Sequence, residues 1–205
     1  MSDSEIVTDA STARSLLERA LTSLAADDWL EAVRDAGQAL VVAPNRELQI
    51  VALEALALAH HALHNWDASC TAGIEALRIG STSSADVLIA ISRYFAANGD
   101  ISRAFGVLEE GFAASRASIP LAGALALLAH QSGDYPKAVA WYDELDRLDP
   151  AGAPTRATVI DDLRLTIERN AQTRSVIEKI GKRIATLARH RVVSGVRLEA
   201  TPSGL

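Results

Sequence analysis

Residues 125–150 read LALLAHQSGDYPKAVAWYDELDRLDP, and this stretch decides the fold. Gly133, Asp134 and Tyr135 stand between two segments whose apolar residues recur at helical spacing. An Asp carboxylate can accept a hydrogen bond from a free backbone N–H at the start of a helix, and Gly suits the left-handed conformation that ends one. The stretch therefore predicts a helix, a tight turn and a second helix.

Related turns occur three more times earlier in the chain. They are Asp27-Asp28-Trp29, His64-Asn65-Trp66 and Gly99-Asp100-Ile101, and the third residues of the four turns are 37, 35 and 34 residues apart. Small residues recur at fixed distances from the turns, with Leu145 as the one large exception. Nine residues before the third turn position stand Ala20, Ala57, Ser92 and Ala126; three residues after it stand Ala32, Ser69, Ala104 and Ala138; and ten after it stand Ala39, Ala76, Gly111 and Leu145. This periodicity predicts helix pairs that approach closely at small side chains and must stack on one another to bury an apolar core.

The repeat resembles the tetratricopeptide family, most clearly in residues 118–150 and 84–117. The resemblance extends over residues 12–150 as four units, of which the first two are 12–45 and 49–82. It implies an all-α, right-handed α-solenoid of antiparallel helix pairs in which the first helix of each unit lines a concave groove. Two departures stand out: Arg19 replaces a Leu that the family usually has, and the second unit lacks the turn glycine.

Residues 155–192 follow a break at Ala-Gly-Ala-Pro-Thr and lack the turn pattern. Two apolar groups, at 159–167 and 176–187, predict two amphipathic helices, the second with Ser175 and Glu178 spaced as a capping box. We expect these C-terminal helices to cap the apolar end of the stack. Residues 1–11 and 193–205 are expected to be flexible ends.

Composition narrows the classes of protein further. The 205 residues are 49% hydrophobic and 4% aromatic, with one cysteine, which excludes a disulfide framework. Neither a secretory signal nor an apolar run of membrane-spanning length is recognisable, so a cytoplasmic location is expected. Residues 1–150 carry 10 Lys and Arg against 21 Asp and Glu, whereas residues 151–205 carry 10 against 5. The acidic body argues against nucleic-acid binding, and a membrane surface is not favoured as a partner.

Candidate chemistry is sparse. His60 and His64 could share a helix face as metal ligands, but no carboxylate follows at motif spacing, so packing and capping roles are preferred for His60, His61 and His64. Cys70 has no evident base and is expected to be a core residue. No glycine-rich phosphate loop is present. We therefore expect no metal, no cofactor and no enzymatic activity.

Protein binding is the expected function. In the tetratricopeptide register the concave groove is rich in leucine and has one fixed cation, Arg93, which suits an apolar helix or peptide better than a carboxylate clamp. The expected partner-binding residues are Leu17, Leu21, Leu58, His61, Ile89, Arg93, Leu127 and His130. The chain would be a non-catalytic adaptor, scaffold or chaperone, and its own basic C-terminal helix is a second candidate for the groove. The alternative is an assembly protein that self-associates or docks through its ends and its basic tail. The tail residues for that role are Lys179, Lys182, Arg183, Arg189 and Arg191.

Overall fold

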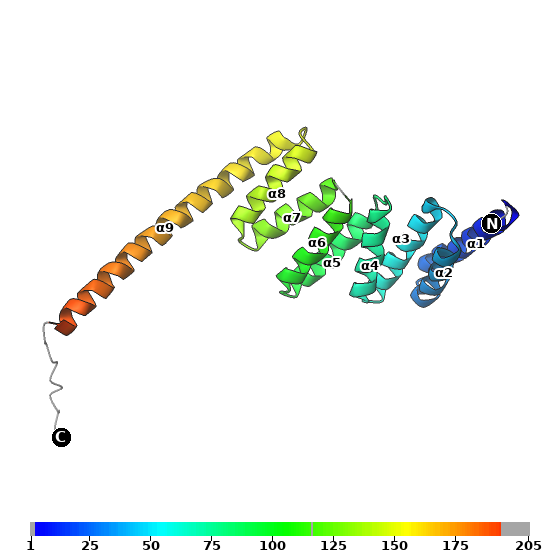
Figure 1. Cartoon of the computed structure of the whole chain (residues 1–205), viewed down its shortest axis with the longest axis horizontal. Coiled ribbons are helices and arrows are strands. Elements are labelled where there is room, and N and C mark those ends of the chain that lie inside the picture. Colours follow the sequence, from blue (N-terminus) through cyan, green and yellow to red (C-terminus); the bar gives the residue numbers. More distant parts are fainter. Residues whose placement is uncertain (1–2, 116, 194–205) are drawn as a thin grey trace, which may run out of the picture.

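The computed structural model describes residues 3–115 and 117–193, and the side chains of residues 9–115 and 117–183. Within them the chain forms nine α-helices and no strand, and successive helices contact each other as antiparallel pairs (Figure 1). The helices are α1 (Asp3–Ala25), α2 (Trp29–Val42), α3 (Arg46–Ala62), α4 (Trp66–Arg78), α5 (Ser84–Ala97), α6 (Ile101–Ser115), α7 (Ile119–Gln131), α8 (Tyr135–Leu148) and α9 (Ala153–Val193). The first eight helices form four hairpins whose turns fall at the four repeated motifs. Residues 3–11, expected to precede the repeats, belong to α1, and the expected tail from residue 194 onwards lies outside the described residues.

Each hairpin turn contains one residue in the left-handed conformation. The φ angles are 60° at Asp27, 57° at His64, 82° at Gly99 and 79° at Gly133, so the two predicted glycines are confirmed in this role. In the other two turns an aspartate and a histidine adopt the same conformation, which is open to these residue types at a modest steric cost. The next backbone N–H then reaches back across the turn, as from Asp134 to the Ala129 carbonyl oxygen at 3.0 Å. This bond satisfies a carbonyl at the helix end that would otherwise lack a partner.

The helix starts follow the predicted caps in three of four hairpins. The carboxylates of Asp28, Asp100 and Asp134 accept hydrogen bonds from backbone N–H groups three residues further on, at 3.3, 3.0 and 3.2 Å. The prediction for Asn65 is wrong, because its side chain makes no capping hydrogen bond at the start of α4.

The predicted small residues lie at the contacts between helices. The sets at nine residues before and three residues after the turn position are all buried, and the set at ten residues after is buried as well. In the second hairpin two members meet directly, because the Ser69 hydroxyl donates to the Ala57 carbonyl oxygen at 2.6 Å. The close approach predicted from the sequence is therefore confirmed.

The first helices of the four hairpins form one continuous layer. Helix α1 contacts α3, α3 contacts α5, and α5 contacts α7, in addition to the contacts within each hairpin. We call the exposed surface of α1, α3, α5 and α7 the odd-helix face. No helix in the described part of the chain is long and apolar enough to cross a membrane.

The bulkiest packing lies in the centre of the array. The largest completely buried apolar side chains belong to the helices α5, α6 and α7, and they are Leu88, Ile91, Leu108, Leu121 and Leu125. Leu88 of α5 fits against glycines of two other helices: a Cβ on Gly73 would lie 3.2 Å from its Cδ2 atom, and one on Gly111 would lie 2.6 Å from its Cδ1 atom. The glycines thus make room for a leucine that joins α4, α5 and α6.

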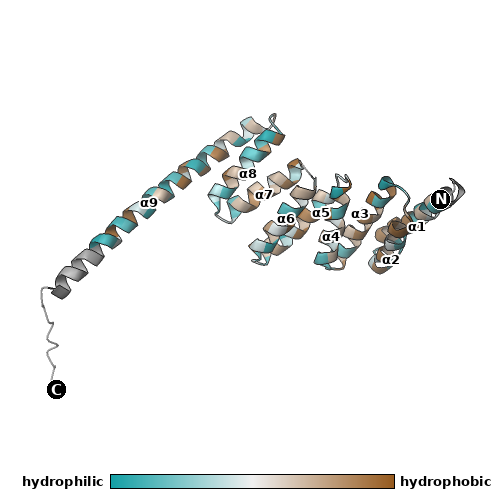
Figure 2. Ribbon diagram, viewed as in Figure 1, coloured by the Kyte–Doolittle hydropathy of each residue, from teal (hydrophilic) through white to brown (hydrophobic). Residues whose placement is uncertain are grey.

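The C-terminal region differs from the expected pair of capping helices. It is a single helix, α9, and Ser175 lies in its interior rather than in a capping box. The segment between the two apolar groups contains no proline or glycine, so nothing in it ends a helix. Only the first part of α9 packs on the array, where Ile160 and Leu163 are buried and the helix contacts α8. The remainder extends away from the hairpins (Figures 1 and 2).

Candidate functional site

A pocket opens on the odd-helix face between α5 and α7. Its volume is about 210 Å³. It is lined by Ile89, Ser92, Arg93, Ala96, Ala124, Leu127, Leu128 and Gln131. Most of these side chains are apolar, so the pocket suits an apolar group of a ligand.

Small side chains create this hollow. Ser92 and Ala96 lie one helical turn apart on α5, and Ala124 lies opposite them on α7. The Ser92 hydroxyl is turned back onto its own helix, where it donates to the Ile89 carbonyl oxygen at 2.8 Å. Ser92 therefore presents little unsatisfied polarity to an apolar ligand.

The rim of the pocket carries one apolar and one cationic side chain. Leu127 is 44% exposed, although large apolar side chains usually lie inside. Arg93 is exposed and makes no ion pair with any residue whose side chain the structure describes. Its guanidinium is thus available to an anionic or hydrogen-bond-accepting group next to the apolar hollow.

Three of the eight predicted partner-binding residues meet in this pocket: Ile89, Arg93 and Leu127. Leu21 of α1 and Leu58 of α3 are each 48% exposed on the same face but outside the pocket. The predicted partner-binding set does not include Ser92, Ala96 and Ala124, the small residues that line the hollow. Ser92 was predicted only as a small residue at a helix contact, and its spacing of four residues from Ala96 is the signal that points to the hollow.

Leu17, His61 and His130 have other environments. Leu17 is 4% exposed and packs with Ala39 and Ala52, so it belongs to the core rather than to a surface that a partner can reach. His61 is half-buried, with its ring edge-on to Trp66 at a centroid distance of 5.2 Å. The His130 ring lies 6.3 Å from that of Tyr135 and does not line the pocket.

The predicted basic-tail residues fall on the part of α9 that leaves the array. Lys179, Lys182 and Arg183 are exposed there, and the side chains of Arg189 and Arg191 lie outside the described set. Helix α9 contacts α8 and no other helix in the described part of the chain. The chain's own C-terminal helix therefore does not cover the odd-helix face.

Two of the three clustered histidines, His61 and His64, contact the Trp66 ring. His64, like His61, meets Trp66 edge-on, at a centroid distance of 5.0 Å. Burial lowers the pKa of His60, and burial followed by the nearby His64 lowers that of His61. Among the residues described, no group of three or more His, Cys, Asp or Glu side chains is placed to hold a metal ion.

Cys70 lines another hollow, between α4 and α6, beside Ile74 and Val107. Burial, together with the carboxylates of Asp67 and Glu110 and against the opposing effect of Arg103, raises the pKa of the thiol to about 11. The thiol is therefore almost entirely protonated at neutral pH, which is unfavourable for a nucleophile.

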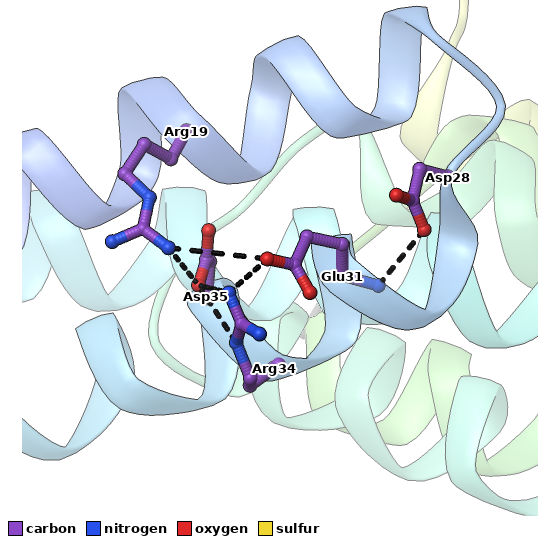
Figure 3. A network of polar contacts seen from close by, with 5 residues as sticks. All are labelled: Arg19, Asp28, Glu31, Arg34 and Asp35. Atoms are coloured by element: carbon purple, nitrogen blue, oxygen red, sulfur yellow. Dashed lines mark hydrogen bonds and ion pairs between the residues drawn. The ribbon is translucent and has the colours of Figure 1, made fainter.

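A polar network links the first two helices (Figure 3). The Asp35 carboxylate, 1% exposed on α2, accepts hydrogen bonds from Arg19 of α1 at 3.0 Å and from Arg34 at 3.2 and 3.3 Å. Arg34 also pairs with Glu31, and Asp28 caps the same turn. Through this network Arg19 ties α1 to the buried carboxylate of α2.

Comparison with known proteins does not identify a family. No protein-family model matches the sequence, and no curated protein is significantly similar to it. The class is set by the fold: an all-helical protein whose antiparallel helix pairs follow one another as a repeat-like array.

Proposed function

We propose that this chain is a non-catalytic protein-binding module of the tetratricopeptide type, serving as an adaptor, scaffold or chaperone. Its odd-helix face would be the concave groove that receives an apolar helix or peptide of another protein. The observation that carries the proposal is the pocket between α5 and α7, where an exposed leucine borders an apolar hollow together with an arginine that forms no ion pair with any described side chain.

The size of the pocket favours a protein partner over a small molecule. At about 210 Å³ it is smaller than the ~300–1,000 Å³ of typical small-molecule sites. It is large enough to take apolar side chains from a segment that also lies along the face, over Leu58 and Leu21. Affinity would come from burying these leucines, at ~25 cal/mol per Å² of apolar surface, less the cost of ordering the bound segment.

Arg93 would favour one direction of the bound segment along the proposed groove. A bound segment would gain a charge-assisted hydrogen bond if it placed a carboxylate or a helix C-terminal carbonyl group next to the apolar side chain in the hollow. We therefore expect partners in which an apolar side chain is followed, within about one helical turn, by such an acceptor.

Site-specific photo-crosslinking in the cell tests the proposal. A photoreactive amino acid at Leu127 should form one discrete adduct with a partner protein, and Arg93→Glu in the same chain should abolish it. Leu30 is the matched control, because it is 72% exposed but lies on α2, away from the odd-helix face. Equal adducts from positions 127 and 30, or an adduct that is indifferent to Arg93→Glu, would rule out the groove as the binding site.

A further inference from the structure

A polar hollow lies between α1 and α2, in the first hairpin. Its volume is about 400 Å³. Every residue that lines it is polar or charged, and the lining consists of Ser15, Glu18, Arg19, Thr22, Ser23, Glu31 and Asp35. None of these residues lines the pocket between α5 and α7, so the hollow is separate from the proposed groove.

The buried member of this lining is Asp35, which has one free carboxylate oxygen. Its Oδ1 atom accepts three hydrogen bonds, one from Arg19 and two from Arg34. Its Oδ2 atom is buried as well and accepts no hydrogen bond from any residue that the structure describes. In Figure 3 the Asp35 oxygen without a dashed line points towards α1, the helix that supplies most of the lining. A buried carboxylate oxygen without a donor is costly, so the hollow favours a ligand that brings one.

The rest of the lining adds negative charge and acceptors. Glu18 is exposed and forms no ion pair with any side chain that the structure describes. Three carboxylates of the lining and the two arginines bonded to Asp35 leave the hollow with a net charge of −1. The hydroxyl groups of Ser15 and Ser23 are further acceptors. A ligand with one positive charge and several N–H donors therefore matches the hollow.

We propose that this hollow binds an alkylammonium group, as carried by a lysine side chain or a free polyamine, and that one of its N–H groups donates to Oδ2 of Asp35. An ammonium group has three N–H donors, no acceptor and one positive charge. A guanidinium group fits less well, because its planar fork suits both oxygens of a carboxylate and the arginines already occupy Oδ1. A divalent metal ion is also disfavoured, since two guanidinium groups already offset most of the negative charge.

Access to the buried oxygen depends on Arg19. Its side chain is 55% exposed, so it can turn outward and admit the ammonium group while Arg34 still holds Oδ1. The acidic body, with 10 Lys and Arg against 21 Asp and Glu in residues 1–150, raises the concentration of cations near the hollow. For a single ammonium group with few contacts we expect a dissociation constant of about 1–10 mM.

An NMR titration of the full chain at constant ionic strength tests the proposal. The probes are Nα-acetyl-lysine amide and spermidine, and tetramethylammonium is the matched control because it carries a positive charge but no N–H donor. We expect both amines, but not tetramethylammonium, to shift the backbone amide signals of Arg19, Ser23 and Asp35. Spermidine binding about tenfold tighter than the lysine probe, or more, would identify a free polyamine as the source of the group, and a smaller ratio would identify a lysine side chain.

Two variants locate the binding in the hollow. Asp35→Asn should weaken binding of the lysine probe by about tenfold or more, because it removes the charge of the free acceptor. Glu18→Gln leaves the network around Asp35 intact and should weaken binding by about threefold, since Glu18 is exposed. If Asp35→Asn does not fold, Glu18→Gln decides. Asp86→Asn is the matched control: it removes one charge from an exposed aspartate of α5 and should leave the affinity unchanged.

The proposal fails if neither amine shifts these signals at about 50 mM, well above the expected dissociation constant. It also fails if tetramethylammonium binds as tightly as the lysine probe, or if Asp86→Asn weakens binding as much as Glu18→Gln. Either result would mean that the acidic body attracts cations without a defined site. Magnesium chloride that shifts the same signals at lower concentrations than the amines would instead indicate a metal site.

Discussion

The first three helices and the central helices use the same hairpin geometry but are held together differently. In α1–α3 the buried apolar residues are mostly alanines, such as Ala20, Ala36 and Ala55, with Leu24 and Leu56 only partly buried against them. In α5–α7 all of the largest completely buried apolar side chains come together in one cluster. Because stabilisation grows with the apolar area buried, the centre should be the more stable region.

In the first region ion pairs converge on a buried carboxylate, whereas the ion pairs of the central helix α6 join exposed or half-buried side chains. The network of Arg19, Glu31, Arg34 and Asp35 joins α1 to α2 across the alanine contacts (Figure 3). Helices of a repeat array can therefore be held close together in two ways. A leucine can pack against glycines of the neighbouring helices, or alanines can pack against one another with ion pairs added at the edge. The four predictions below test this difference.

Leu88→Ala should have the largest effect. Leu88 is completely buried and contacts helices on both sides, so the substitution removes apolar contacts and leaves a cavity, and we expect a loss of about 3–5 kcal/mol in the free energy of unfolding. Leu17→Ala provides the comparison in the first region. Its neighbours Ala39 and Ala52 lie near the open end of the array, where the structure can relax, so we expect a loss nearer to about 2 kcal/mol. Urea denaturation measures both, and equal losses would contradict the proposed difference between the regions.

Arg19→Leu should destabilise the first region by about 1–2 kcal/mol, because it removes one charged partner from the nearly buried Asp35 carboxylate. The effect is limited since Arg34 remains and both arginines are about half exposed. The double variant Arg19→Leu with Asp35→Leu should recover part of the loss, as an apolar pair replaces the ion pair. Arg14→Leu, an exposed arginine on the same helix, should be nearly neutral in the same denaturation assay.

Much of the fold could be predicted from the sequence because the hairpin turns depend on local chemistry. A left-handed glycine, an aspartate cap and small residues at fixed distances from the turn act within about one helical repeat, and they gave the hairpins correctly. The continuity of α9 was not predicted, because the capping-box spacing of Ser175 and Glu178 looks like a helix start. No residue before it ends the preceding helix, so the helix continues through it.

The candidate site could be predicted only in part. Ile89, Arg93 and Leu127 were selected from their register, and the structure places all three on one pocket. Leu17 was selected by the same rule yet lies in the core, because α1 is the first helix of the array and its contacts with α2 and α3 set which face is buried. A register defines a helix face, whereas exposure depends on how the neighbouring hairpins pack.

Gly111→Ala should cost about 1 kcal/mol, as the difference between two opposing effects. Alanine favours a helix interior over glycine by about 1 kcal/mol, but its Cβ would lie 2.6 Å from the Cδ1 atom of Leu88, and overpacking costs about 1–3 kcal/mol. Gly106→Ala on the same helix meets nothing within 4 Å and should be stabilising. In the Leu88→Ala background the sign for Gly111→Ala should reverse, because the clash is gone. A destabilising Gly111→Ala in that background would show that the glycine does not serve to accommodate Leu88.

Acidification should have the smallest effect on the free energy of unfolding, and it should act where α3 and α4 of the first region meet α5 of the centre. His61 of α3 packs on Trp66, whose ring lies 4.4 Å from that of Tyr94 in α5. The folded state lowers the pKa values of His60 and His61 below the ordinary 6.5, so the unfolded chain binds more protons and the free energy of unfolding falls as the pH decreases below about 6.5. The stabilisation present above that pH is then lost towards the folded-state pKa values, and solvent screening keeps the loss small because both rings are only partly buried. His61→Phe should keep the edge-on contact and flatten the decrease in melting temperature between pH 7.5 and pH 5.5, whereas His130→Phe, away from this contact, should leave the decrease unchanged.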